Sequence, residues 1–388
     1  MSSDQSISWE EGGVTHSALW RSENGIRPHQ KLIIGDDTLT ADSAYRMACE
    51  GTAILWRGDF QNARQLLQAL ARRIDKPSKK SSRSKKDPNQ SQLDIFNLHR
   101  LAQSQRARTL GMLLIECNAE HHIDLRRAPD IAQACEAAYG PTQSSYLVSL
   151  RELLGVVGAY EWRKKGVLIP ALSGTQAFHI HPHYGVFSPI RGEYIDLVNQ
   201  APLPKILDSH PIAFDIGVGT GILSITLASR GIAKIIATDL DQRALECAKD
   251  NIERSNFTKQ IELLKTNLFP EGKAALIVCN PPWLPARPSS PLESAVYDPN
   301  SQMLTGFLSG LKDHLLPAGE AWLILSDLAE YLGLRSREQL QGWFDEAGVK
   351  VIDRMNIKPH HKKVFDQTDP LHAARSKEVT SLWRLILK

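Results

Sequence analysis

One stretch decides the fold of this 388-residue chain: Asp215-Ile216-Gly217-Val218-Gly219-Thr220-Gly221. An apolar, strand-like segment at residues 211–214 precedes it, and a helix-like segment at residues 222–228 follows it. Glycines in such a loop permit a tight turn and let the backbone approach a ligand without an intervening Cβ. A strand, a glycine loop and a helix in this order are typical of nucleotide-binding α/β folds of several classes.

From residue 212 onward, strand-like and helix-like segments alternate. We expect strands near residues 212–216, 235–239, 261–264, 275–279, 320–326, 349–355 and 382–387. We expect helices near residues 221–230, 241–255, 301–315 and 335–347. Alternating β and α segments predict a parallel sheet with helices on both faces. The sequence therefore predicts an α/β, Rossmann-like domain in the second half of the chain.

A second acidic residue, Asp239, ends the expected strand at residues 235–239. It lies about 20 residues beyond the glycine loop, where nucleotide-binding folds place the acid that accepts ribose hydroxyls. Enzymes that bind NAD share such an acid, so Asp239 alone does not identify the cofactor. The loop reads Gly-x-Gly-x-Gly rather than the Gly-x-Gly-x-x-Gly of dinucleotide-binding proteins, which disfavours a NAD-type oxidoreductase.

The run Asn280-Pro281-Pro282-Trp283 carries the most information about chemistry. The two prolines fix φ, remove two backbone donors and push the preceding residues toward extended conformations, so the turn is stiff. At the carboxyl end of a parallel strand, this turn holds the side chain of Asn280 and the carbonyl of Pro281 in fixed directions. Both oxygens can accept the N–H groups of a flat amide or amine, while Trp283 stacks on its π-face.

An Asn-Pro-Pro-aromatic turn downstream of a glycine loop resembles the signature of class I S-adenosylmethionine-dependent N-methyltransferases. These enzymes act on adenine N6, on guanine N2 or on the side-chain amide of protein glutamine. The resemblance implies a seven-stranded domain, S-adenosylmethionine as the cofactor and methyl transfer to a planar nitrogen. It implies that the catalytic residues are Asn280, Pro281, Pro282 and Trp283.

The same resemblance implies a cofactor site made by Asp215, Gly217, Gly219, Gly221, Asp239, Asn267 and Leu268. In the family, an Asp after the third strand usually meets the adenine amino group of the cofactor. Asn267 stands at that place here, and its side-chain carbonyl can still accept a hydrogen bond from adenine N6. Leu268 is then expected to form a wall of the adenine pocket.

The first 160 residues have a different texture. Within residues 60–70, apolar side chains recur at the i, i+3, i+4, i+7 spacing of one buried helix face. Further helices are expected near residues 41–47, 95–117, 131–139 and 144–160. We therefore expect an α-helical substrate-recognition domain at residues 1–160, a short β-hairpin connection at residues 161–200 and the methyltransferase domain at residues 201–388.

Composition indicates an ordinary globular protein, with 42% hydrophobic and 23% charged residues. No run of 18 apolar residues is present, so we expect no membrane partner. The five cysteines are scattered without a CxxC pair, and no secretory signal is visible, so we expect a cytoplasmic protein without a zinc site. His179, His181 and His183 alternate along one strand-like segment, but we expect structural roles for them and predict no metal.

The acceptor is expected to be part of a macromolecule. Basic stretches at residues 76–86 and 358–363, with Arg100 and Arg106, favour the amino group of an RNA or DNA base. The alternative is a glutamine of a ribosomal or translation protein, because residues 297–299 resemble an acid-proline loop of protein-glutamine N5-methyltransferases. A NAD-type oxidoreductase and a non-catalytic RNA-binding factor are the more distant alternatives.

Overall fold

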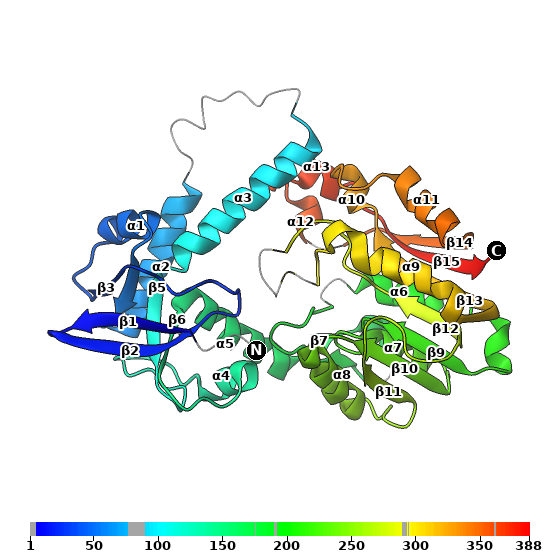
Figure 1. Cartoon of the computed structure of the whole chain (residues 1–388), viewed down its shortest axis with the longest axis horizontal. Helices are drawn as coiled ribbons and strands as arrows, with labels where there is room; N and C mark the ends of the chain where they lie inside the picture. The colour runs from blue at the N-terminus through cyan, green and yellow to red at the C-terminus, as the bar shows by residue number, and fades with distance from the viewer. Residues whose placement is uncertain are drawn as a thin grey trace. The chain divides into compact units, whose positions relative to one another are not determined.

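The computed structural model describes residues 5–76, 90–174, 176–189, 192–288, 293, 295–360 and 362–388 (Figure 1). The chain divides into two compact units. The first comprises Met1–Ser91 and Asn97–Glu161, and the second comprises Gln92–Phe96 and Trp162–Lys388. Helices α3 (Gln92–Leu110) and α5 (Leu150–Lys165) each contribute residues to both units.

The second unit contains the predicted seven-stranded sheet, in the order β11-β10-β9-β12-β13-β15-β14. Its strands are β9 (Ile212–Ile216), β10 (Lys234–Asp239), β11 (Ile261–Lys265), β12 (Ala274–Cys279), β13 (Leu315–Ser326), β14 (Val349–Ile357) and β15 (Thr380–Leu387). The five strands β11, β10, β9, β12 and β13 are parallel to one another, whereas β15 is antiparallel to both of its neighbours. The predicted strands and the α/β fold class are confirmed.

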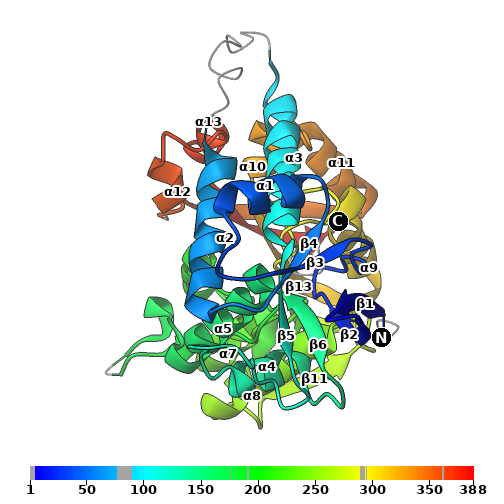
Figure 2. The same ribbon diagram turned by 90° about the vertical axis from the view of Figure 1, so that its left-hand side faces the viewer.

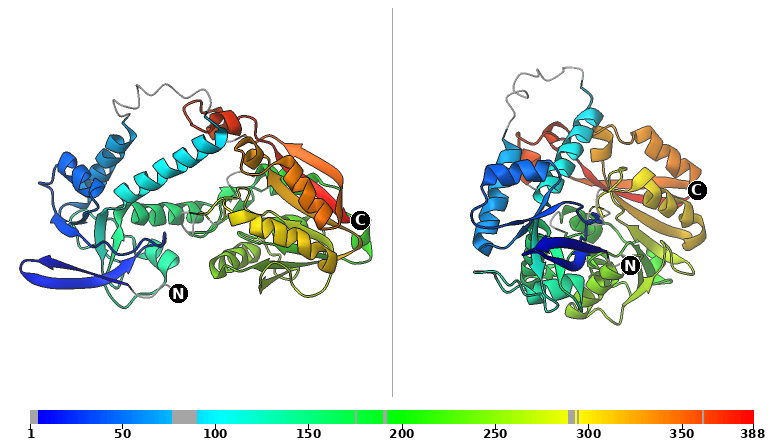
Figure 3. Two further views of the ribbon diagram at one scale, coloured as in Figure 1. Left: turned by 45° about the horizontal axis from the view of Figure 1, so that its top comes forward. Right: turned by 60° about the vertical axis from the view of Figure 1, so that its left-hand side comes forward.

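Helices cover both faces of this sheet (Figure 3). On one face, α6 (Glu193–Gln200), α7 (Ile222–Ser229) and α8 (Gln242–Arg254) share an apolar core with residues such as Ala213 and Val278. On the other face, α9 (Gln302–His314) and α11 (Arg337–Glu346) pack on residues such as Phe214 and Ile277. Neighbouring residues of β9 and β12 enter opposite cores, as the alternation of a strand requires.

Three further helices of the second unit are short: α10 (Leu328–Tyr331), α12 (Lys362–Phe365) and α13 (His372–Arg375). Helix α10 follows β13, and α12 and α13 lie in the connection between β14 and β15. Because β15 is antiparallel to β13, its first residue, Thr380, lies at the same sheet edge as the carboxyl end of β13. This edge therefore gathers the loops that follow β9, β10, β12 and β13 and the segment that precedes β15.

The first unit contradicts the prediction of an α-helical domain at residues 1–160, because it holds a six-stranded sheet in the order β1-β2-β6-β5-β4-β3. The strands are β1 (Ser6–Glu11), β2 (Val14–Arg21), β3 (Leu32–Gly35), β4 (Ala53–Trp56), β5 (Leu113–Cys117) and β6 (Tyr146–Ser149). The predicted helices do occur among them, as α1 (Ala41–Cys49), α2 (Phe60–Asp75), α3, α4 (Ala132–Tyr139) and α5. Figure 2 brings these elements to the front.

The strands of the first unit escape pattern analysis for two reasons. Strands β4 and β5 are short and apolar on both faces, except for the half-buried Glu116 of β5. Such short apolar runs cannot be distinguished from a buried helix by periodicity. Strands β1 and β2 are joined by Gly12 and Gly13, both with positive φ, and pair as an antiparallel hairpin. A Gly-Gly pair between two alternating runs is a hairpin signal, which the helical interpretation overlooked.

Between the two large sheets in sequence, β7 (Val167–Leu168) and β8 (His179–Ile180) form a two-stranded antiparallel sheet. Ile169 N donates to the carbonyl of Phe178 and extends this pairing by one bond. The region at residues 161–200 also contains α6, so it is more than a hairpin. Among the described residues, every helix falls short of the length and apolarity that a membrane crossing would need.

Candidate functional site

A cavity of about 460 Å³ lies at the sheet edge where the parallel strands end. Its lining includes Gly217 and Gly219 after β9, Asp239 at the end of β10, and residues 280–283 after β12. Ligand sites of open α/β sheets lie outside the carboxyl ends of the strands, and this volume is in the range of small-molecule sites. Five residues that the sequence singles out as catalytic or ribose-facing therefore share one cavity with the glycine loop.

The glycine loop is held close to β10 by backbone hydrogen bonds. Gly217 N and Val218 N both donate to the carbonyl of Thr238, at 2.9 and 2.8 Å. Gly217, Gly219 and Gly221 all have positive φ, which residues with a Cβ adopt only with strain. A Cβ on Gly217 would lie 2.6 Å from Cε of Met303, whereas a Cβ on Gly219 would meet no atom within 4 Å.

Gly221 serves packing rather than the cavity lining. It precedes α7 in a left-handed conformation, and a Cβ there would lie 3.3 Å from Cα of Ala248 on α8. The third glycine of a nucleotide-binding loop has this role, since it allows close packing of the adjoining helix. Gly221 thus fixes the direction of α7, and through it the position of the loop.

Asp239 faces the glycine loop from the end of β10. Its Oδ2 accepts a hydrogen bond from Gly219 N at 3.2 Å, and its Oδ1 accepts one from Asp241 N at 2.9 Å. A carboxylate offers about four lone-pair sites, so both oxygens can still accept ribose hydroxyls. Burial raises the pKa of Asp239 above its usual value, and the nearby Asp241 adds to the effect.

Asp215 does not line the cavity. Its side chain is fully buried, and Oδ2 accepts a hydrogen bond from Ser224 Oγ at 2.5 Å while Oδ1 has no partner in the described chain. Burial raises the pKa of Asp215 to about 6. The structure therefore places this residue beneath the loop, where it joins β9 to α7, rather than against a ligand.

Asn267 and Leu268 also lie outside the cavity lining. Asn267 is exposed, and Leu268 is half-buried against the core on the α9 side of the sheet. The carbonyl of Leu268 accepts a hydrogen bond from Thr238 Oγ1 at 2.5 Å, which ties the segment after β11 to β10. The structure thus brings neither side chain together with the other predicted cofactor residues.

The Asn-Pro-Pro-Trp turn places an amide and an indole together. Trp283 Nε1 donates a hydrogen bond to Asn280 Oδ1 at 2.9 Å. An indole N–H is only a donor, so this contact turns the carbonyl oxygen of Asn280, and not its NH₂ group, toward Trp283. An amide oxygen has two lone pairs, so Asn280 Oδ1 can accept a second N–H from a ligand in the cavity.

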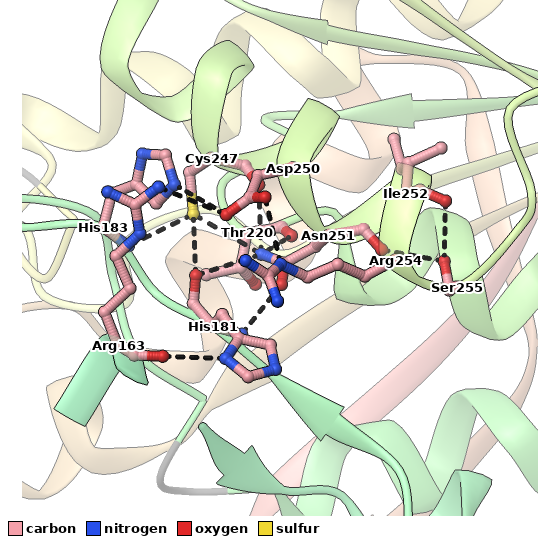
Figure 4. Close-up of polar contacts among 10 residues, drawn as sticks. All are labelled: Arg163, His181, His183, Thr220, Cys247, Asp250, Asn251, Ile252, Arg254 and Ser255. Carbon is pink, nitrogen blue, oxygen red and sulfur yellow. Dashed lines mark hydrogen bonds and ion pairs between the residues drawn. The ribbon is translucent and has the colours of Figure 1, made fainter. Parts of the chain in front are cut away.

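Residues 185–187 form one wall of the cavity, although no pattern in the sequence predicts this role. The segment before them is fastened to α8 by the buried Asn251, as Figure 4 shows. Asn251 Oδ1 accepts from His181 N at 2.8 Å, and its Nδ2 donates to the carbonyl of Thr220 at 3.1 Å. One amide therefore couples this wall to the glycine loop.

Ionic contacts hold the same segment. His183 Nε2 and Arg163 Nη2 both contact Asp250 Oδ2, at 3.2 and 3.3 Å (Figure 4). Burial lowers the pKa of His183, and the neighbouring Arg163 acts in the same direction. His181 contacts the carbonyl of Arg163 through Nδ1, so His181 and His183 have structural partners. Among the described residues, no group of three or more His, Cys, Asp or Glu side chains is arranged to hold a metal.

The opposite wall contains residues 295–297, Met303 and Leu328. Next to them, the buried Asp298 caps α9: its carboxylate accepts from Met303 N at 3.0 Å and from Leu304 N at 3.1 Å. Leu284 and Tyr297 form an isolated parallel bridge, which joins this wall to the segment after the proline turn. In the sequence, residues 297–299 stand out only because they resemble the acid-proline loop of protein-glutamine N5-methyltransferases.

Two other aromatic side chains and one cation complete the lining: Phe187, Tyr194 and Arg375. Phe187 remains 37% exposed, whereas Tyr194 of α6 is buried. Burial raises the pKa of Tyr194 above its usual value, so the phenol is neutral. These residues reach the cavity from segments without a local signature, and nothing in the sequence alone marks them.

The basic segments stand apart from this cavity lining. Of the stretch at 76–86, residues 77–86 lie outside the described residues, as does His361. Arg106 Nε and Nη2 donate to the two carboxylate oxygens of Asp75 within the first unit. Lys358 is exposed, and His360 N donates to Glu193 Oε1.

Comparison with known proteins adds independent findings. Residues 201–283 match the family model described as ribosomal protein L11 methyltransferase (PrmA). A putative protein N5-glutamine methyltransferase of Methanocaldococcus jannaschii is 31% identical over 157 residues, which are 38% of this chain and 75% of that relative. A tRNA1(Val) (adenine(37)-N6)-methyltransferase of Shewanella loihica is 29% identical over 178 residues, 42% of this chain and 71% of that relative.

Among solved structures, a ribosomal protein L11 methylase of Lactobacillus delbrueckii subsp. bulgaricus has a TM-score of 0.34 at 18% identity. The match covers 52% of this chain and 81% of that chain. The family model matches part of the chain that lines the cavity. Residues 201–283 contain the glycine loop, Asp239 and the Asn-Pro-Pro-Trp turn.

Proposed function

Because the chain belongs to the class I S-adenosylmethionine-dependent N-methyltransferases, we propose that its acceptor is the exocyclic amino group of a nucleic-acid base. The methyl donor is S-adenosylmethionine and the acceptor nitrogen belongs to a macromolecule, which sets the oxidoreductase alternative aside.

The observation that carries the proposal is the composition of the cavity around Asn280. An amide oxygen that can accept an N–H lies 2.9 Å from the indole nitrogen of Trp283, and Phe187 and Tyr297 line the same cavity. Flat bases that are taken out of a stack are held between aromatic side chains and read by hydrogen bonds to their edges. A glutamine side chain has a planar amide but no ring, so it would leave much of this aromatic surface unused.

The residues present fit the cofactor. Gly217 and Gly219 line the cavity without side chains, and a Cβ on Gly219 would point into open space. Asp239 offers carboxylate oxygens for ribose hydroxyls, and apolar neighbours such as Val218 and Ala244 line the adjacent wall. When bound, S-adenosylmethionine supplies an activated methyl group on a positively charged sulfur.

The chain's own contribution is to orient and polarise the acceptor nitrogen. The lone pair of a base amino group is delocalised into the ring, so that nitrogen is a poor nucleophile. In the proposed mechanism, Asn280 Oδ1 and the carbonyl of Pro281 accept its two N–H bonds, which returns electron density to nitrogen. The same two oxygens stabilise the positive charge that develops there. Trp283 stacks on the ring and keeps the nitrogen in place.

A protein glutamine is the second candidate acceptor. It is favoured by one observation, the 31% identity to a putative protein N5-glutamine methyltransferase across 75% of that relative. The amide of glutamine has the same two N–H donors, so the roles of Asn280 and Pro281 would be unchanged. The first unit would then recognise a folded protein instead of a nucleic acid.

One experiment separates the two acceptors. The purified full chain is incubated with S-adenosylmethionine labelled in its methyl group and with cell extract, which is then divided between nuclease and protease. We expect that nuclease releases the label and that protease does not. Complete digestion of the nucleic acid should then yield a methylated base. Label that resists nuclease and is released by protease would establish the glutamine alternative.

A further inference from the structure

The cavity carries its charges at opposite ends. Among the described lining residues, the acid Asp239 ends β10 and the acid Asp241 follows it, whereas the one Arg or Lys side chain is Arg375. Arg375 belongs to α13, which precedes β15. In the sheet order β10-β9-β12-β13-β15, the strand that carries Asn280 lies between these two ends. Arg375 is therefore on the far side of Asn280 from the acid proposed to hold the ribose.

The guanidinium of Arg375 is oriented but not saturated. Its Nε forms an ion pair with Asp369 Oδ2 at 3.1 Å but donates no hydrogen bond, and both side chains are largely buried, with 15% and 9% exposed. Asp369 is itself fixed, because its Oδ1 accepts from Leu371 N at 3.0 Å. In the described chain, the terminal nitrogens Nη1 and Nη2 of Arg375 donate no hydrogen bond to any residue.

The backbone that carries Arg375 is anchored. Leu371 directly precedes α13 and Ala374 lies within it, and both are buried in an apolar cluster with Leu284 and Leu328. Leu284 directly follows the Asn-Pro-Pro-Trp turn, so the position of Arg375 is tied to the catalytic segment. The site is thus a preoriented cation in a mostly apolar wall.

We propose that Arg375 binds a backbone phosphate of the nucleic-acid acceptor and so selects nucleotides over other planar amines. The inference rests on the proposed base acceptor. A guanidinium presents a planar fork that matches two phosphate oxygens, and burial strengthens such charge-assisted hydrogen bonds. Every base in a nucleic-acid strand has a phosphate within one nucleotide of its ring, whereas a glutamine side chain carries no anion. The ion pair between Nε and Asp369 keeps the guanidinium at this wall, and Nη1 and Nη2 are available to the phosphate.

The test measures binding of a fluorescently labelled, single-stranded RNA of mixed sequence to the full chain with S-adenosylhomocysteine present, over a range of salt concentrations. Arg375→Gln should weaken binding roughly tenfold at low salt. The slope of log Kd against log salt concentration should fall by about 0.7, since one phosphate contact on a single strand is lost. Arg375→Lys should keep the slope but lose affinity, because the fork is lost and the charge is kept.

Two controls make the result decisive. Lys234→Gln removes a positive charge from the opposite edge of the same sheet, where Lys234 pairs with Glu262, and should change neither affinity nor slope. Arg375→Gln alone leaves the buried carboxylate of Asp369 without its partner, which can destabilise the protein. The double variant Asp369→Asn with Arg375→Gln removes both charges and avoids this effect. Unchanged affinity and slope in the double variant, with S-adenosylhomocysteine binding intact, would overturn the inference. If instead the proposed function is wrong, the methyl label from S-adenosylmethionine is found only in protein, for the wild-type chain and for the Arg375 variants alike.

Discussion

Trp283 Nε1 donates a 2.9 Å hydrogen bond to Asn280 Oδ1 within the turn that follows β12. The two residues are three positions apart, and the prolines between them fix the backbone that sets this distance. The indole therefore determines which end of the Asn280 amide faces the cavity. Trp283 has two roles in this account, a stacking surface for the acceptor and a support for the residue that accepts its N–H group.

The variant Trp283→Phe separates these two roles. Phenylalanine keeps an aromatic face but has no N–H, so Asn280 loses the donor that orients it. We expect kcat to fall by roughly tenfold, the equivalent of one hydrogen bond of about 1.4 kcal/mol, while affinity for S-adenosylhomocysteine stays unchanged. Steady-state methyl transfer and calorimetry measure the two quantities. Full kcat in the phenylalanine variant would mean that the indole contact does not support catalysis.

Gly217→Ala tests the close approach of the loop. Alanine at φ +80° is strained, and its Cβ would lie 2.6 Å from Cε of Met303 at the cavity wall. Gly231→Ala is the matched control, because Gly231 has φ +90° and open space around its Cβ. Both variants should lose about 1 kcal/mol of stability.

Only Gly217→Ala should also weaken cofactor binding, as measured by titration with S-adenosylhomocysteine. Equal cofactor affinity in the two alanine variants would show that the loop does not approach the ligand at this position.

We expect the carboxylate of Asp239 to make cofactor binding dependent on pH. Burial raises its pKa, and only the ionised form accepts hydrogen bonds at both oxygens. Affinity for S-adenosylhomocysteine should therefore be highest above this raised pKa and decline as the pH falls through it. Asp239→Asn should bind more weakly by about 1–3 kcal/mol and should lose the pH dependence. A wild-type affinity that is flat with pH would contradict this role.

Asp215 predicts a pH effect on stability rather than on binding. Its pKa is raised to about 6, above the value of about 3.9 in an unfolded chain, so the folded state keeps a proton that the unfolded state has released. The free energy of unfolding should then decrease as the pH rises from about 4 to about 6. Asp215→Asn lacks this titration and should gain stability at neutral pH, on the order of 1–3 kcal/mol relative to wild type. Denaturant unfolding at several pH values measures the difference, and parallel curves for the two proteins would refute it.

The second unit was predictable because its signals are local and agree with one another. Strand β12 is a short apolar run that ends at Asn280, and β10 ends at an acid, so each strand carries its own boundary. In the first unit the signals conflict. Strand β5 is a five-residue buried run that directly follows a long helix, and the apolar residues of both merge into one helical pattern.

The site was predictable to the extent that its residues follow strands. Asp239 is the last residue of β10 and Asn280 comes directly after β12, and parallel strands bring their carboxyl ends to one edge. Phe187 and Arg375 reach the same cavity from connecting segments whose path depends on tertiary packing. Asn267 follows the edge strand β11, and its exposed side chain is not part of the cavity lining.

The central claim is that the Asn-Pro-Pro-Trp turn and the glycine loop form one methyl-transfer site in which Asn280 orients the acceptor nitrogen. The most direct test is the rate of labelled methyl transfer by Asn280→Ala, measured beside its affinity for S-adenosylhomocysteine. The account predicts that transfer is lost while cofactor affinity changes little, because this interaction forms with the acceptor in the transition state. Wild-type turnover by the alanine variant would contradict it.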